Sequence, residues 1–103
     1  MTYRVETSET AEVEMKEIAN YISDELHSLQ AAYDLMYKIR QQINALNKMP
    51  MRYPLVSDER LAQMGVRSVP IKNYSIFYTV DEQERIVNII NVMYSGRDWA
   101  NLL

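Results

Sequence analysis

The sequence has 103 residues, with 11 Lys and Arg against 14 Asp and Glu, one histidine and no cysteine. The lack of cysteine excludes a disulfide framework and a thiolate metal site, and a single histidine excludes a cluster of histidine ligands. The formal charge of −3 is opposite in sign to the excess that proteins gripping a nucleic-acid backbone usually carry.

The length allows one modest core, so the chain is predicted to be a single domain over residues 1–103. Its first ten residues, MTYRVETSET, lack the basic and apolar segments of a signal peptide. No apolar run approaches the length that spans a bilayer. We therefore expect a cytoplasmic protein that does not engage a membrane.

The chain begins with a short strand and a first amphipathic helix. Tyr3–Thr7 alternates between apolar and charged side chains, which predicts a strand. Ser8 follows in a position to cap a helix, because its hydroxyl can accept from a free N–H of the first turn. Apolar side chains then recur at helical spacing on one face: Ala11, Met15, Ile18, Ala19 and Ile22.

A second helix is predicted after Ser28, which can cap it. It should end near Met49, because Pro50 disfavours helical geometry in the residue before it. Its apolar stripe consists of Ala32, Leu35, Met36, Ile39, Ile43 and Leu46. The two helices are expected to form a helical hairpin whose stripes need an apolar partner.

Three extended runs in the second half predict an antiparallel meander. They are Val66–Ile71, Tyr74–Val80 and Ile86–Met93, and short polar breaks separate them. The middle run has strict alternation, which places Tyr74, Ile76, Tyr78 and Val80 on one side. The segments before the meander are a stretch over residues 50–56 with two prolines, which cannot be regular structure, and a linker or single helical turn over residues 57–64.

The fold predicted from these elements is a two-layer α+β domain in the order β-α-α-β-β-β. A helical hairpin covers one face of a mainly antiparallel sheet. The tail over residues 96–103 is expected to dock its large apolar side chains, Trp99, Leu102 and Leu103, on the body of the domain.

Several short motifs occur in one order and spacing along almost the whole chain: Ala31–Ala32, Met49–Pro54, Gly65–Arg67, Asn73–Tyr78 and Val92–Trp99. Together they resemble the RelE/ParE superfamily, the toxins of type II toxin–antitoxin modules. The resemblance implies a toxin that a cognate antitoxin silences by wrapping its C-terminal segment around it. It implies no cofactor and no metal.

The resemblance leaves two mechanisms open. RelE-like members are similar in fold to microbial ribonucleases and cut messenger RNA in the ribosomal A site without a metal. ParE-like members share the scaffold, lack a convincing catalytic set and are held to poison DNA gyrase.

Three residues are the candidates for the site of a nuclease: Arg67, Arg97 and Tyr94. Arg67 matches the arginine that RelE-like nucleases place beside the scissile phosphate, although an arginine paired with an acid is the ordinary alternative. Arg97 matches the arginine after the last strand, where many relatives have two adjacent basic residues and this chain has Gly96–Arg97.

Tyr94 stands where many relatives carry histidine, and a neutral tyrosine is a poor base near neutral pH. It could stack on a base, donate a proton or simply fill a gap at the strand end. His27 is expected to be an exposed loop residue, and Glu59 belongs to a solvated run of charges. Tyr21, Tyr33 and Tyr37 flank the helical stripes, where they suit an interface or partial burial.

The hypothesis that follows is a growth-inhibiting toxin of the ParE-like kind, which acts by binding a target such as DNA gyrase. It depends on the lack of histidine in the second half, of lysine between Pro50 and Gly65, and of net positive charge. The alternatives are a ribosome-dependent endoribonuclease that uses Arg67, Arg97 and Tyr94, and a non-toxic binding module. A homodimer or a toxin–antitoxin hetero-oligomer is compatible with all three.

Overall fold

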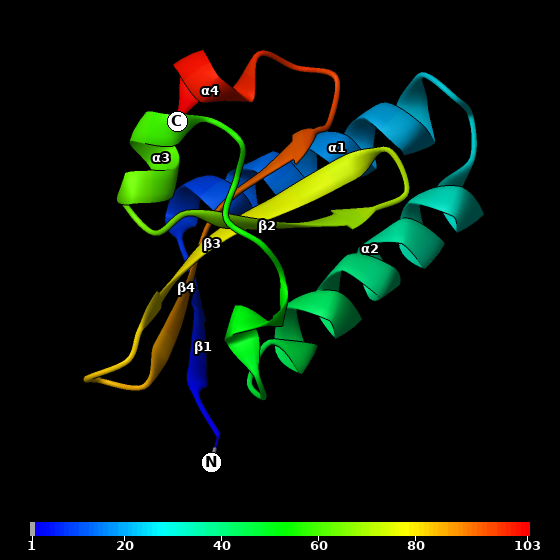
Figure 1. Ribbon diagram of the computed structural model, residues 1–103. Coiled ribbons are helices and arrows are strands. Elements are labelled where there is room, and N and C mark those ends of the chain that lie inside the picture. The colour runs from blue at the N-terminus through cyan, green and yellow to red at the C-terminus, as the bar shows by residue number, and fades with distance from the viewer. Residues whose placement is uncertain (1) are drawn as a thin grey trace.

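The computed structural model describes residues 2–103 (Figure 1). Four strands and two long helices make up the domain, together with two short helices and one 3₁₀ turn. In chain order they are β1 (Arg4–Thr7), α1 (Glu9–Asp24), α2 (Leu29–Ala45), η1 (Pro50–Arg52), α3 (Glu59–Gln63), β2 (Arg67–Ile71), β3 (Tyr74–Asp81), β4 (Ile86–Tyr94) and α4 (Trp99–Leu102). The predicted β-α-α-β-β-β order of an α+β fold is confirmed. Within the described part of the chain, no helix combines the length and apolarity needed to cross a membrane.

The four strands form one sheet in the order β1-β4-β3-β2. The predicted meander is present, since β2 pairs antiparallel with β3 and β3 pairs antiparallel with β4. The N-terminal strand joins beside β4 and runs parallel to it, with Arg4 opposite Ile86 and Thr7 opposite Ile89. β1 and β2 are therefore the two edges of the sheet, and Pro70 in β2 suits an edge because it has no N–H to donate.

Both helices begin where the serine caps predict. The hydroxyl oxygen of Ser8 accepts from the N–H of Ala11 at 3.0 Å, and that of Ser28 accepts from Ala31 at 3.2 Å. α2 ends at Ala45, four residues before Met49, so the predicted boundary is too late. The chain tightens there, because the N–H groups of residues 46–48 bond to carbonyls three residues back, as in a 3₁₀ turn.

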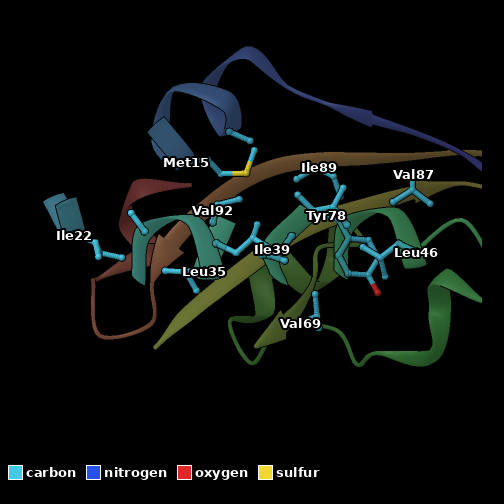
Figure 2. Close-up of a cluster of buried hydrophobic side chains, with 14 residues drawn as sticks. Met15, Ile22, Leu35, Ile39, Leu46, Val69, Tyr78, Val87, Ile89 and Val92 are labelled. Carbon is cyan, nitrogen blue, oxygen red and sulfur yellow. The ribbon is translucent and has the colours of Figure 1, made fainter. Parts of the chain in front are cut away.

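The main core lies between the helical hairpin and one face of the sheet (Figure 2). The helical stripes supply Met15, Leu35 and Ile39, and Tyr78 and Val92 meet them from the strands. All five side chains are buried. The apolar stripes that the sequence predicts for the two helices thus pack against the sheet.

The opposite face of the sheet is partly covered too, which the two-layer prediction did not include. A second cluster joins Leu61 of α3 and Phe77 of β3 with Trp99, whose ring centroid lies 5.3 Å from that of Phe77. Leu103 also packs there, whereas Leu102 is 50% exposed, so its predicted docking is wrong. Residues four apart share a side of a helical turn, so Trp99 and Leu103 face the sheet together while Leu102 points elsewhere.

The proline-bearing segment contains one piece of regular structure that the sequence reasoning excluded. Pro50–Arg52 forms a single 3₁₀ turn, η1, which Pro50 begins. A proline fits the first position of a helical turn, because its missing N–H would have no partner there. The turn after it, α3, is the single helical turn expected between residues 57 and 64.

Candidate functional site

An open groove of about 590 Å³ lies between α1 and the adjoining ends of β3 and β4. Three aromatic rings, those of Tyr21, Tyr74 and Tyr94, line it together with Arg97. We call this site, defined by those four residues, the tyrosine groove. Glu14 and Glu17 of α1 also line it.

The strand register brings two of the three rings together. Tyr74 begins β3 and lies opposite Tyr94, the last residue of β4. Their ring centroids are 6.0 Å apart and the planes meet at 76°, an edge-to-face arrangement that aromatic pairs favour. Burial, together with the nearby Tyr21 and Tyr94, raises the pKa of Tyr74 above its ordinary value. The Tyr74 phenol is therefore a neutral hydrogen-bonding group at neutral pH.

A β-bulge in β4 aims Tyr94 into the groove. Phe77 pairs with Asn91 and the next residue, Tyr78, pairs with Ile89, so Ile90 has no partner across the strand pair. The extra residue shifts the alternation by one position. Val92 and Tyr94 consequently face the helices, the same side as Ile89 before the bulge.

Two side chains of the first helix region hold this bulge. The Ser8 hydroxyl donates to the carbonyl of Ile90 at 2.9 Å. A carboxylate oxygen of Glu14 accepts from the N–H of Val92 at 2.9 Å, and both its oxygens accept from the side-chain amide of Asn91 at 3.1 and 3.2 Å. Glu14 thus serves the strand geometry, which leaves Glu17 as the more available acid of the groove.

The turn after β4 explains the unusual Gly96–Arg97 pair. The N–H of Arg97 bonds to the carbonyl of Tyr94 at 3.0 Å and closes the turn. A Cβ at Gly96 would lie 2.5 Å from the Tyr94 ring, so the ring occupies the space that a side chain would need. Tyr94 and a basic residue at position 96 are therefore alternatives in this geometry.

The Arg97 guanidinium is exposed at the rim of the tyrosine groove. Among residues 2–103 the ion pairs are Arg4–Glu6 and Arg40–Glu12, so Arg97 has no acidic partner in that part of the chain. Arg97 also forms no ion pair with its neighbour Asp98, which would be the ordinary structural role for an arginine at this position. The groove therefore offers a free cation beside phenol hydroxyls.

Arg67 lies elsewhere and is engaged with the backbone. It is half-buried, and its Nη1 donates to the carbonyl of Tyr53 at 2.6 Å and to that of Met51 at 3.4 Å. Its neighbour across the strand pair, Tyr78, donates its buried hydroxyl to the carbonyl of Pro50 at 2.6 Å. The two side chains fasten the segment 50–53 to the sheet. Arg67 forms no ion pair with an acid among residues 2–103, so the ordinary alternative does not hold, and its guanidinium bonds to two carbonyls.

The sheet separates the predicted site residues into two places. Arg67 pairs with Tyr78 and Tyr94 pairs with Tyr74, positions that lie four residues, or about 13 Å, apart along β3. Two strand spacings, about 10 Å, separate β2 from β4 as well. The structure brings Tyr94 and Arg97 together and leaves Arg67 outside the tyrosine groove.

The remaining candidates are placed as the sequence analysis expects. His27 is exposed in the connection between α1 and α2, and Glu59 is exposed at the start of α3. No group of three or more potential metal ligands occurs among residues 2–103. The sequence places Tyr21 beside a helical stripe and Tyr74 in a strand, and neither pattern predicts that both line one groove. The signal that could have united them is the Tyr74–Tyr94 pairing, which needs the strand register.

Comparisons with known proteins give one family match and several similar folds. The family model described as the ParE toxin of the type II toxin–antitoxin system parDE matches residues 5–99. No curated protein sequence matches the chain.

Among solved structures, the chromosomal ParDE system of Pseudomonas aeruginosa is similar at a TM-score of 0.74 and 15% identity, over 90% of this chain and 96% of that one. A free variant of the Escherichia coli toxin RelE is similar at 0.68 and 12%, over 99% and 93%. The RelBE2 toxin–antitoxin complex of Mycobacterium tuberculosis is similar at 0.64 and 16%, over 94% and 95%. These likenesses support the fold, and the family match spans nearly the whole domain. The chain belongs to the ParE toxin family of type II toxin–antitoxin systems.

Proposed function

We propose that this toxin inhibits growth in the ParE manner, by binding a protein target such as DNA gyrase, and that the tyrosine groove is its contact site. The observation that carries the proposal is the make-up of the groove: three tyrosines and one arginine beside two carboxylates. Tyrosine and arginine, with tryptophan, are the side chains enriched at the energetic centres of protein–protein interfaces.

The charges of the groove favour a protein ligand over RNA. The groove is lined by one cation, Arg97, and by the two carboxylates of Glu14 and Glu17, so its lining has no positive excess. Attraction of a phosphate backbone depends on such an excess. The pair of carboxylates would repel phosphate, whereas a protein segment with a basic side chain would find acceptors there.

The separation of Arg67 from Tyr94 and Arg97 also argues against RNA cleavage. A metal-free nuclease needs a base, an acid and cations around one phosphate. Here the guanidinium of Arg67 is bonded to loop carbonyls. The two remaining candidates, Tyr94 and Arg97, provide one phenol and one guanidinium.

A cognate antitoxin completes the proposal. The similar RelBE2 structure from M. tuberculosis is a toxin–antitoxin complex. We expect the same kind of partner for this chain, and we expect both proteins to act in the cytoplasm. A host that made the growth inhibitor without an antitoxin could not grow, so the toxin needs a neutralising partner.

The test combines induction of the chain in a bacterial host, where growth is followed, with an assay of the purified chain. Messenger RNA ends are mapped, and supercoiling by purified gyrase is measured with the purified chain. Lost supercoiling with intact messages is the expected result. New cuts at codon boundaries would instead favour a RelE-like endoribonuclease, and normal growth would favour a non-toxic binding module.

Two variants locate the activity in the groove. Arg97→Ala and Tyr94→Ala should each weaken target inhibition by roughly tenfold or more, as loss of an interface centre does. Arg4→Ala is the matched control, since Arg4 is exposed, lies outside the groove and forms an ion pair with Glu6. Equal inhibition by Arg97→Ala and Arg4→Ala would remove the groove from the proposal.

A further inference from the structure

The outer face of α2 carries an apolar stripe that the rest of the domain leaves uncovered. Leu29, Tyr33 and Tyr37 follow one another at intervals of four residues, and their exposed fractions are 64%, 66% and 65%. This spacing places them along one side of the helix. Scattered apolar residues are normal on a surface, but a contiguous row of this kind marks an interaction site.

A recess lies directly beside the stripe. The hollow between α1 and α2 has a volume of about 280 Å³, and small or flexible side chains line it: Ala19, Ala32 and Met36. Leu29 and Tyr33 line the same hollow. The face therefore combines protruding rings with a cavity of ring size. In a two-fold dimer the same patch of each copy meets the other, so a single patch must supply both the protruding rings and the cavity that receives them.

The charges beside the stripe are arranged for the same symmetry. Asp34 and Lys38 each follow a tyrosine of the stripe, so they lie on one flank, one helical turn apart. When two such helices pack antiparallel about a two-fold axis, like flanks meet, and Asp34 of each copy faces Lys38 of the other. Neither residue has an ion pair among residues 2–103; Asp34 accepts only from the amide of Gln30, at 2.9 Å.

We propose that this chain self-associates through the α2 stripe as a two-fold dimer with antiparallel α2 helices. Two tyrosines and a leucine that are about two-thirds exposed contribute roughly 400 Å² per copy, so the apolar contact is small for a specific interface. A weak dimer follows, with a dissociation constant on the order of 10–100 µM. The stripe and its recess share no residue with the tyrosine groove, so the dimer leaves both grooves open.

Sedimentation velocity on the purified chain, over concentrations from about 1 to 300 µM around that constant, tests the proposal. Tyr33→Ala should raise the dissociation constant by about tenfold or more. Tyr94→Ala is the control, because it removes a half-exposed tyrosine outside the stripe and should leave association unchanged.

Charge reversal gives the decisive comparison. Asp34→Lys and Lys38→Asp should each weaken association about tenfold, because each creates two like-charge contacts. The double variant D34K/K38D restores the pairs and should recover the association of the parent. All these side chains are exposed, and circular dichroism with thermal melting confirms that each variant folds. A chain that stays monomeric throughout, or a double variant no better than the singles, would overturn the proposal.

Discussion

Removal of one buried hydroxyl should loosen the segment that carries η1. In Tyr78→Phe the carbonyl of Pro50 loses its donor while the ring still fills the core. Pro50 is buried, so water cannot easily replace the bond. An unsatisfied buried acceptor costs about 1–3 kcal/mol, which lowers the midpoint of thermal unfolding by roughly 5–15 °C in a domain of this size.

The same hydroxyl gives a second, independent signal at high pH. Burial is the main cause that raises the pKa of Tyr78 to about 12 from its ordinary value of 10.0, and the nearby charge of Arg67 acts in the opposite direction. Between these two pH values the folded protein keeps a proton that the unfolded chain has lost. Its stability therefore falls as pH rises from about 10 to about 12, by roughly 2–3 kcal/mol.

Urea unfolding at pH 7 and across the alkaline range measures both effects. Tyr78→Phe should be less stable at neutral pH and should lose less stability on the way to pH 12, since its ring cannot ionise. Tyr94→Phe, which removes an exposed hydroxyl, is the matched control and should match the parent at pH 7 within about 0.5 kcal/mol. If the two variants unfold at the same urea concentration, the Tyr78–Pro50 bond does not hold the segment.

Three further changes probe the other contacts. Glu14→Leu removes the acceptor that holds the bulge and should cost about 1–3 kcal/mol in urea unfolding, whereas Glu14→Gln keeps one acceptor oxygen and should cost less. Arg40→Met should cost less than about 1 kcal/mol, because the Arg40–Glu12 pair is exposed. That cost should vanish in acid titration, since Arg40 lowers the pKa of Glu12 and its contribution is lost as pH falls below the ordinary 4.5. Gly96→Lys should rotate the exposed Tyr94 ring away with little loss of stability, visible as changed ring chemical shifts in NMR spectra.

Local features of the sequence predict most of the fold because they act over short distances. Ser8 and Ser28 bond to residues three positions away, and both do so in the structure. The strict alternation that begins at Tyr74 also predicts which side of β3 meets the helices. These signals depend on spacing alone, which a single sequence displays.

The site was less accessible to such reasoning, because its geometry depends on contacts between distant residues. Glu14 reaches Val92 across 78 positions, and this bond holds the bulge that turns Tyr94 toward the groove. The apolar sequence of β4 contains no feature that predicts the bulge at Ile90. Similarly, the carbonyl of Tyr53 occupies Arg67, although an arginine near a strand start looks equally available for a phosphate.

These contacts determine which substitutions can separate stability from target binding. Arg67 holds a loop remote from the tyrosine groove, so Arg67→Ala should lower stability and leave groove binding intact. Arg97 is exposed and makes no side-chain contact with an acid of residues 2–103, so Arg97→Ala should weaken binding at constant stability. Glu14 lines the groove and also fixes the strand register that presents Tyr94, so its loss should affect both quantities together. A groove that binds its target independently of the bulge would show undiminished binding in Glu14→Leu, and Glu14 would then support the fold alone.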